Sequence, residues 1–358
     1  MKLEVAGIEY ENFTSASAEI RLDALSNTFS FEAATTKKTP LPFTGGETCR
    51  IIVDDIPVIT GYLEILSGSY DDSGHNLYIQ GRDKTGDLLD SGISELGDIK
   101  EKVSLKSIIE KVVDNIGADI QVIDNANPKL FNSAEDISAP EPGENAFQFL
   151  EKLARKRQVL LTSNGDGNIV ISTSPGGDSG GFLQNLIGVN GNNVLTASFT
   201  YDQTGRFNIY QFKAGLNPVA LNSAGTVGID TLVNQSGLIR DTKIRAGRQM
   251  ILISEGAYSD DENEKRALWE ARIRKARGRV YSASVRGYRP LPDAKWLWDV
   301  NQLVTVVDDF AQINAQMLIN SVAFSYNVDS GKTTTLAMVE KNAYSLTLDE
   351  PKTEELGF

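Results

Sequence analysis

The chain of 358 residues contains one cysteine, Cys49, and one histidine, His75. A disulfide within the chain is therefore impossible, and nothing in the sequence depends on an oxidising compartment. A zinc site of the usual cysteine and histidine type needs more of these ligands than the chain has. No dinucleotide-binding glycine motif follows a strand either. We therefore expect no metal site and no cofactor.

Long apolar segments are also absent. No stretch approaches the 18 apolar residues that a membrane-spanning helix needs. The N-terminal segment carries Glu4, Glu9 and Glu11 where a signal peptide requires an apolar run. We therefore expect a soluble protein, made in the cytoplasm, with no membrane span.

Positive charge is scarce in the chain as a whole. It has 35 Lys and Arg against 48 Asp and Glu, a net charge of −13. Such a chain is a poor candidate for binding phosphates or an anionic membrane over its whole surface. Hydrophobic residues make up 41% and charged residues 23%, which is typical of globular proteins and excludes wholesale disorder.

The first domain is predicted over residues 1–92. Segments with alternating apolar residues are separated by turn residues, and abundant glycine favours many tight turns. These segments are Phe29–Ala33, Cys49–Val53, Pro57–Ile65 and Asn76–Gly81. Short strands at this spacing indicate a small antiparallel barrel or sandwich, and we assign a β-barrel.

Residues 93–172 are predicted to form an α+β domain. Ser104 can cap a helix whose apolar residues recur at helical spacing, and Gly117 is a good stop for it. A second amphipathic helix is expected over Glu144–Arg157, followed by a hairpin. Residues 173–193 are rich in glycine and asparagine and are predicted to be a linker.

A second β-barrel is predicted over residues 194–347, interrupted by a helix at about 261–278, and residues 348–358 are expected to be a flexible tail. Its strands are expected at 194–201, 206–212, 242–255, 280–289, 301–308, 316–327 and 332–340. The predicted fold class is therefore mainly β (α+β). It has two small antiparallel β-barrel domains, an α+β domain between them and a long helix in the second half.

This helix is strongly basic. Seven basic residues and Glu270 lie between Lys265 and Arg279, a local charge of +6. One interpretation is a solvated helix face whose basic end complements the helix dipole. Another is a positive surface that docks on an acidic patch of a neighbouring subunit. Nucleic-acid binding is less favoured, because no aromatic platform accompanies the charge beyond Trp269. The four residues assigned to a docking surface are Arg272, Arg274, Lys275 and Arg277.

Residues Gly177–Gly181 read GDSGG, the string around the nucleophile of chymotrypsin-like proteases. That chemistry needs a serine, a histidine base and an aspartate in contact. His75 is the only possible base, and it lies in a polar turn sequence, while the residues around Ser179 have loop composition. A serine hydrolase at Ser179 is therefore an alternative that we rank below a simple turn.

Several segments together resemble a known family. Gly61–Glu64 followed by Leu77–Asp90 is similar to the first barrel of Mu-like bacteriophage baseplate hub proteins, the tail protein P family. Arg266–Arg279, with Val285–Tyr288 after it, resembles that family's helix and following strands. The middle of the chain, with Leu150–Arg155, is similar to a domain shared with late-control D proteins and the N-terminal part of type VI secretion spike proteins.

This resemblance implies a structural protein and not an enzyme. It implies a homotrimer whose two barrels per chain form a pseudo-sixfold ring, which joins the tail tube to the central spike of a contractile phage tail and lines the passage for DNA. The implied partners are the tail tube protein, the central spike protein and the baseplate wedge proteins. The implied location is the virion tail baseplate, of a phage or prophage, after synthesis in the bacterial host cytoplasm. Because the sequence stops at Phe358 after a polar tail, we expect the spike to be a separate protein.

An acidic chain suits a ring through which DNA slides without sequence-specific binding, because like charges repel. We therefore expect a neutral or negative lumen, with the basic helix facing protein. Unpaired strand edges are natural places for subunits to join. The candidate segments are Leu25–Ala33 and Val194–Phe212, and the candidate interface residues in them are Phe29, Phe31, Phe199 and Tyr201.

A carbohydrate-binding β module is the alternative from another class, since it would also be acidic and rich in strands. Such a module should show aromatic residues clustered on one exposed face. The three tryptophans, Trp269, Trp296 and Trp298, instead lie beside the helix and in one loop.

Overall fold

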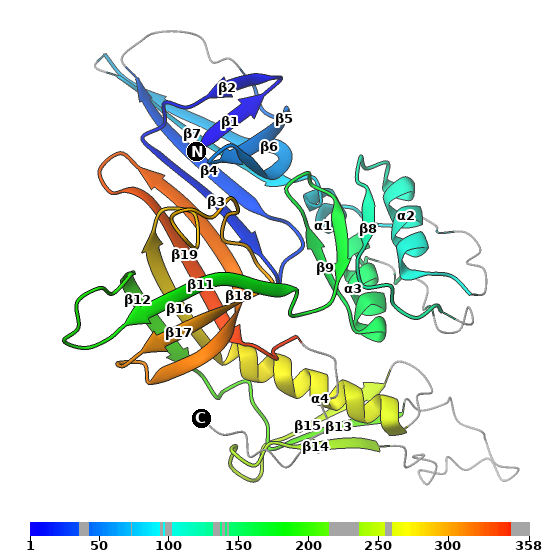
Figure 1. The fold of residues 1–358 in the computed structure, drawn as a ribbon. Coiled ribbons are helices and arrows are strands. Elements are labelled where there is room, and N and C mark those ends of the chain that lie inside the picture. The colour runs from blue at the N-terminus through cyan, green and yellow to red at the C-terminus, as the bar shows by residue number, and fades with distance from the viewer. Residues whose placement is uncertain are drawn as a thin grey trace, which may run out of the picture. The chain divides into compact units, whose positions relative to one another are not determined.

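The computed structural model describes residues 1–35, 43–72, 74–93, 96, 102–131, 137, 140–141, 143–214, 236–254 and 260–344. The chain divides into two compact units. The first unit contains Met1–Phe199 and Tyr281–Lys341, and the second unit contains Thr200–Val280. Strands dominate the first unit (Figure 1), and the prediction of a mainly β protein is confirmed.

The first unit is built on one sheet of 13 strands. Its strands in the first part of the chain are β1 Lys2–Val5, β2 Ile8–Tyr10, β3 Ser15–Arg21, β4 Thr28–Thr35, β5 Thr48–Val53, β6 Ile56–Tyr70 and β7 His75–Asp83. Those in the later part are β11 Gly177–Asn185, β12 Val194–Tyr201, β16 Arg279–Arg286, β17 Gln302–Asp308, β18 Ile313–Asn327 and β19 Gly331–Glu340. The main order is β12-β16-β19-β18-β3-β4-β7-β6-β5-β1-β2, with β17 beside β18 and β11 beside β17. The antiparallel pairing of β3 with β18 therefore joins the two parts into one sheet.

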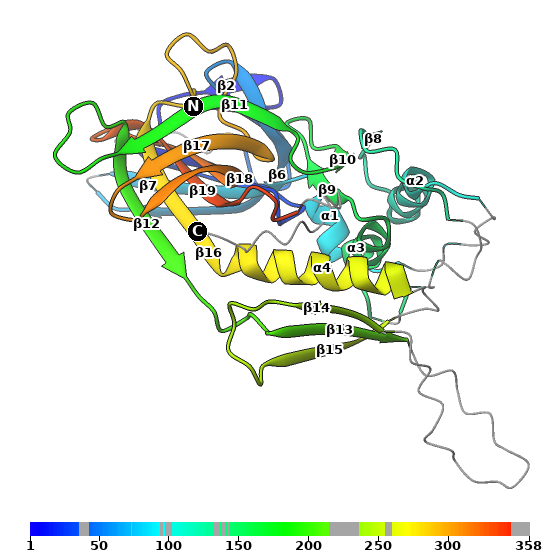
Figure 2. The same ribbon diagram turned by 60° about the horizontal axis from the view of Figure 1, so that its bottom comes forward.

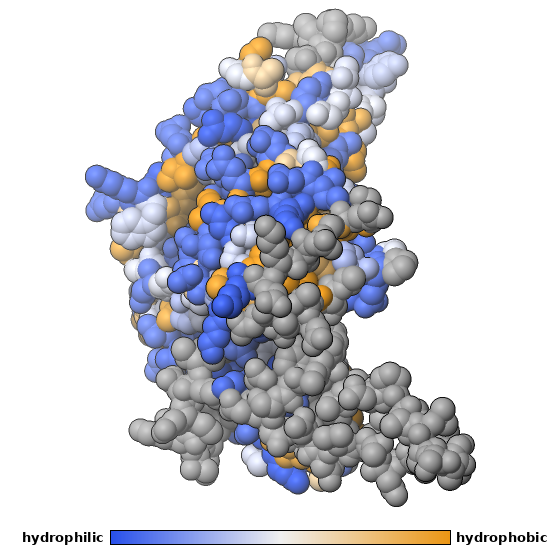
Figure 3. Space-filling view, turned by 90° about the vertical axis from the view of Figure 1, so that its right-hand side faces the viewer, coloured by the Kyte–Doolittle hydropathy of each residue, from blue (hydrophilic) through white to orange (hydrophobic). Residues whose placement is uncertain are grey.

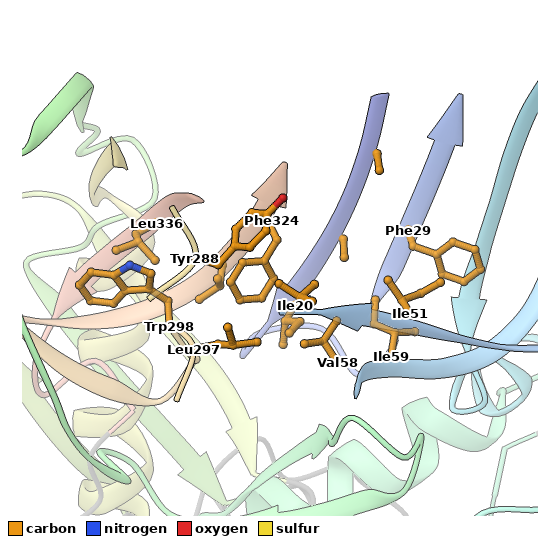
Figure 4. Close-up of a cluster of buried hydrophobic side chains, with 14 of the residues drawn as sticks. Ile20, Phe29, Ile51, Val58, Ile59, Tyr288, Leu297, Trp298, Phe324 and Leu336 are labelled. Atoms are coloured by element: carbon orange, nitrogen blue, oxygen red, sulfur yellow. The ribbon is translucent and has the colours of Figure 1, made fainter. Parts of the chain in front are cut away.

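These two parts share one hydrophobic core, because alternate residues of each strand point to the same face. In β3, for example, Ala16, Ala18 and Ile20 are buried, whereas the residues between them are only half-buried. Figure 4 shows Phe29 from the first part and Phe324 from the later part within the same cluster of buried side chains. Burial of this continuous apolar cluster is the main favourable contribution to folding of the first unit.

A small α+β part belongs to the first unit. It contains α1 Gly86–Asp90, α2 Leu105–Ile116, β8 Val122–Asp124, α3 Ala146–Arg157, β9 Leu160–Ser163 and β10 Ile169–Ser172. The Ser104 side chain accepts a hydrogen bond from the backbone of Ser107, and Gly117 ends α2 with a φ of 70°, so both predicted ends of this helix are confirmed. The next helix, α3, begins two residues later than expected, because Asn145 and Gln148 form a capping box.

The second unit contains a sheet of three strands and one helix. These are β13 Ile209–Ala214, β14 Ser236–Arg240, β15 Gln249–Ser254 and α4 Asp260–Arg277. Figure 2 shows α4 lying along one face of this sheet, and Tyr210 and Ala267 are buried in the core of the unit. This differs from the single barrel expected over residues 194–347, because the segment between β12 and β16 forms its own sheet and core.

The segment expected to be a linker, residues 173–193, contains a strand, β11, which runs parallel to β17. Alternate side chains of β11, those of Ser179 and Leu183 among them, are buried. Gly181 is required by close packing, since a Cβ at this position would lie 2.3 Å from the Trp298 ring. The glycines that led us to predict a linker therefore belong to a packed strand, in which Gly181 leaves room for Trp298. The tail expected at residues 348–358 lies outside the described residues.

The surface drawn in Figure 3 is mostly hydrophilic where residues are described, with hydrophobic residues in small patches. Such a mixture is normal for an exposed protein surface. Among the described residues, no helix has both the length and the apolar composition needed to cross a membrane.

Candidate assembly interfaces

The sheet of the first unit contains one arrangement twice. Strands β5, β6 and β7 form an antiparallel meander, and so do β17, β18 and β19. In each meander the middle strand has 15 residues and one register shift against the third strand. The shift lies between Leu63 and Ile65 in β6 and between Ile319 and Ser321 in β18. The two meanders therefore match strand by strand.

The sequence carries a trace of this repeat that our sequence analysis missed. The matching strings are VDD at 53–55 and 307–309, SY at 69–70 and 325–326, and DSG at 72–74 and 329–331. The SY strings and the register shifts have the same spacing, since 69 and 325, like 63 and 319, differ by 256. Strings this short are weak signals in a sequence, but the SY strings occupy equivalent places in β6 and β18.

The two middle strands differ in how their edges are covered. The first half of β18, Ile313–Leu318, pairs with β17. The second half, Ser321–Asn327, pairs with β3 along the same edge. In β6, β5 pairs with Ile56–Tyr62, and the following segment Ile65–Tyr70 has β7 on one side. Among the strands that the structure describes, none covers the other edge of this segment. Tyr70 at its end is 80% exposed. Such an edge is a natural site for pairing with another chain.

A second exposed edge is β12, which ends the sheet and has β16 as its neighbour among the described strands. All of its side chains from Leu195 to Tyr201 are exposed, and Tyr201 is 53% exposed. The ring of Phe199 lies 6.0 Å from the ring of Phe310, which is itself 75% exposed. The predicted interface residues Phe199 and Tyr201 therefore lie together on an exposed edge strand.

Phe29 and Phe31, the other two aromatic residues predicted for an interface, lie in the core. They are 2% and 0% exposed, and their strand, β4, is covered by β3 on one side and β7 on the other. The alternation of β4 turns both rings to the inner face, where they make an edge-on contact with their centroids 6.1 Å apart. Their aromatic character therefore reflects packing of the core, and the prediction that they lie at an interface is corrected.

The four basic residues predicted for an interface lie in α4 of the second unit. Arg274 is held within that unit, since its Nε is 2.6 Å from Oε1 of Glu270, one helical turn away. Arg272 and Lys275 are half-buried, and Arg277 is exposed. Of the four, Arg277 therefore offers the most accessible charge to a partner.

Ser179, the serine of the GDSGG string, lacks the surroundings of a nucleophile. It is 1% exposed, and its hydroxyl donates a hydrogen bond of 2.8 Å to the carbonyl oxygen of Leu303. His75 is the first residue of β7, where its ring stacks on Tyr70 at 5.7 Å. His75 is half-buried in a strand, whereas we expected it in a turn. Both residues are thus occupied by structural contacts.

The tryptophans give little support for a carbohydrate-binding face. Trp298 is 2% exposed and belongs to the core of the first unit. Trp296 is 49% exposed, and its indole nitrogen donates a hydrogen bond to the carbonyl oxygen of Ser179. Trp298 is therefore not available to stack on a sugar.

Models of protein families match three segments of the chain. Residues 1–83 match the N-terminal domain of Mu phage baseplate assembly protein GpP-like proteins. Residues 85–173 match the second domain of baseplate hub protein gp44-like proteins. Residues 259–347 match the fourth domain of Mu phage baseplate assembly protein GpP. The fold and these matches define the class of the protein as a phage tail component.

Relatives along most of the chain identify the family. The baseplate hub protein gp44 of Escherichia phage Mu is 25% identical over 309 residues, which cover 84% of this chain and 76% of that protein. The 43 kDa tail protein of prophage MuSo2 from Shewanella oneidensis has a TM-score of 0.80 and 28% identity, covering 96% of this chain and 98% of that one. A tail protein from Neisseria meningitidis MC58 shares the fold, with a TM-score of 0.77 and 19% identity over 96% and 97% of the two chains. The chain belongs to the family of Mu-like phage baseplate hub proteins.

The family gives the chain a structural role in a phage baseplate. The relatives are structural tail and baseplate proteins, and the comparisons offer no support for an enzyme.

Proposed function

We propose that three copies of the chain form the hub ring of a contractile phage tail baseplate. The ring joins the tail tube to the central spike and lines the passage for DNA. Its partners are the tail tube protein, the spike protein and the baseplate wedge proteins, and it resides in the virion tail.

The observation that carries this proposal is the repeat within the sheet of the first unit. A ring that joins a sixfold tube to a threefold spike needs a subunit with two equivalent faces. The meanders β5–β7 and β17–β19 supply two such faces, each with its long middle strand and its register shift. Three copies with two repeats each would present six similar surfaces to the tube. The repeat also supports the proposal that each chain contains a pair of small barrel domains.

Charge distribution supports a passage that does not hold DNA. Thr200–Val280 has 13 basic and 9 acidic residues, a net charge of +4, so the remainder of the chain carries −17. Phosphates are repelled by an acidic lumen and bound by a basic one. We therefore assign the acidic remainder to the lumen and assign α4, with Arg272, Arg274, Lys275 and Arg277, to contacts with protein.

Light scattering on a sizing column, over a series of protein concentrations, tests the ring. We expect a mass three times that of the chain, and electron microscopy of that fraction should show a ring with a central opening. A strictly monomeric protein at all concentrations, also after addition of the spike protein, would contradict the proposal.

The lumen is tested separately by a gel-shift experiment with duplex DNA at low salt. We expect no retained DNA, since phosphate binding by a basic lumen would be strongest under this condition. Retention that disappears in an Arg272→Glu/Arg277→Glu variant would place the basic helix in the passage and contradict the assignment.

A further inference from the structure

We propose that neighbouring copies of the chain join by pairing β12 of one copy with the segment Ile65–Tyr70 of β6 in the next. This inference rests on the proposed ring and specifies its joint. This joint between subunits would have the same antiparallel strand pairing that β3 and β18 have within the chain. In both cases an outer strand of one repeat covers the second half of the long strand of the other repeat.

The repeat identifies which strand of the later part corresponds to β4. Phe29 of β4 pairs with Gly81 of β7, and Tyr281 of β16 pairs with Met338 of β19. Gly81 and Met338 occupy the same place, because each lies opposite the residue that precedes the register shift of the long strand. Hence β16 corresponds to β4. Their outer neighbours in the sheet, β12 and β3, correspond as well.

The alignment of β12 with β16 shows which residue of β12 corresponds to which residue of β3. The backbone N–H of Asp202 donates a hydrogen bond of 2.7 Å to the carbonyl oxygen of Gly278. Continuing that antiparallel alignment by three residues places Phe199 opposite Tyr281. The residue at the equivalent place in β3 is Ala18, which lies opposite Phe29. The alignment also matches Ser-Ala-Ser at 15–17 with Thr-Ala-Ser at 196–198.

The register of β3 on β18 then predicts the register of β12 on β6. The transferred pairs are Leu66 with Tyr201, Gly68 with Phe199, Ser69 with Ser198 and Tyr70 with Ala197. In the joint within the chain, the aromatic residues Phe324 and Tyr326 each face an alanine of β3. The predicted joint has the same property, because Phe199 faces a glycine and Tyr70 faces an alanine. At these two positions a large side chain therefore meets a small one, whereas Leu66 and Tyr201 form a pair of large side chains, as Val322 and Ile20 do within the chain.

The proposed joint explains why residue 68 is a glycine better than the contacts within its own chain do. A Cβ at this position would have the carbonyl oxygen of Asn76 as its nearest neighbour at 3.6 Å, which is an ordinary contact. The chain itself thus leaves room for a side chain at position 68. Across the joint, a side chain there would instead meet the ring of Phe199 from the neighbouring copy.

The joint also determines the kind of contact between copies. It connects two different segments, β12 and β6, so each copy uses one segment on either side. Contacts of this head-to-tail kind form a closed ring when the rotation between copies closes, and an open filament when it does not. Closure after three copies would give a hub of six repeats.

Disulfide cross-linking tests the register directly. Ser69→Cys and Ser198→Cys in one chain should give covalent trimers under oxidising conditions, because each copy links to the next. Either single variant should give none. Ser69→Cys with Ala197→Cys is the matched control, since residue 197 points to the other face of the sheet. The native Cys49 is 1% exposed and can stay in place.

A positive control exists within the chain. Ser17 and Ser325 form the pair in the β3–β18 joint that corresponds to Ser198 and Ser69. Ser17→Cys with Ser325→Cys should therefore form a disulfide inside one chain. A linked Ser17/Ser325 pair, together with a trimeric mass and no Ser69/Ser198 link, would overturn the joint and leave the hub ring standing. A monomeric mass with no link would overturn both.

A side chain at position 68 provides a second measurement. Gly68→Val should leave the thermal unfolding temperature of the monomer unchanged within about 2 °C, given the room around its Cβ, because surface changes of this kind are usually small. It should nevertheless reduce the fraction of trimer at least tenfold at a given concentration. An unchanged trimer fraction would contradict the predicted contact with Phe199.

Discussion

Lys332 and Asp54 are 278 residues apart in the sequence, and their Nζ and Oδ1 atoms lie 2.7 Å apart in the structure. Arg289 approaches the other carboxylate oxygen of Asp54 at 3.5 Å. Burial opposes ionisation of Asp54, but the positive charges of Lys332 and Arg289 outweigh it and lower the pKa of Asp54. These ion pairs tie the turn between β5 and β6 to the later part of the sheet.

We expect Asp54→Asn to lower the free energy of unfolding at pH 7 by about 1 kcal/mol, because the partners are partly exposed. The pKa of Asp54 is lower in the folded than in the unfolded chain. Its stabilisation is therefore present above about pH 4 and lost as the pH falls through the folded pKa. Denaturant unfolding at several pH values should show the two proteins converging in acid. Asp55→Asn, in the same turn, is the control, and an equal loss in both variants would contradict the prediction.

Ser179→Ala tests the structural role of the serine in the GDSGG string. The Ser179 hydroxyl donates to the carbonyl oxygen of Leu303 and accepts a hydrogen bond from the backbone of Gly181. Losing both bonds in a buried strand should lower the free energy of unfolding by about 1–3 kcal/mol. A fluorophosphonate probe should leave the wild-type serine unlabelled. Covalent labelling that disappears in Ser179→Ala would revive the hydrolase alternative.

The buried ion pair of the second unit should control the stability of that unit. Nη2 of Arg206 lies 2.5 Å from Oδ2 of Asp241, and their side chains are 1% and 7% exposed. Asp241→Ala leaves the guanidinium buried without its carboxylate, which should cost about 3–5 kcal/mol. Calorimetry should show an earlier unfolding transition for the second unit, with the transition of the first unit unchanged. The double variant Arg206→Met/Asp241→Leu should recover part of the loss, and an equal loss in both variants would contradict this account.

Asp299 should make the free energy of unfolding of the first unit depend on pH. It lines a cavity with Leu297, Trp298 and Phe324, and burial of its carboxyl raises its pKa to about 6. Because the folded pKa lies above the unfolded value, Asp299 favours folding at low pH, and this contribution is lost as the pH rises through about 6. Asp299→Asn should therefore be more stable than the wild type at pH 8 and not at pH 4. The difference should be about 1 kcal/mol at most, because Asp299 as a whole residue is exposed although its carboxyl group is buried.

Unfolding curves at pH 4, 6 and 8 check this dependence. Asn keeps the side-chain oxygen that accepts a hydrogen bond from the backbone of Val300, so the substitution removes only the ionisation. A difference between the two proteins that stays constant over this pH range would show that Asp299 does not titrate there.

Features that depend on nearby residues were readable in the sequence. The ends of α2 follow from Ser104 and Gly117, since a cap and a left-handed glycine act within one helical turn. The family was also readable, because segments that resemble its members occur in the right order along the chain. The repeat was in principle readable from the SY strings, but a string of two residues gains meaning only when the strands that contain it are known to be equivalent.

The sequence by itself therefore determined the mainly β class, the ends of α2 and the family. Only the tertiary structure decided that residues 177–185 form a strand beside β17, that Phe29 and Phe31 are buried, and that Thr200–Val280 folds separately. It also decided which half of each long strand is covered. The physical reason is that pairing of strands and burial of a face depend on partners more than a hundred residues away, as between β3 and β18. A local pattern fixes which residues can form a strand, and the partner that the strand meets fixes whether its edge stays open for another copy.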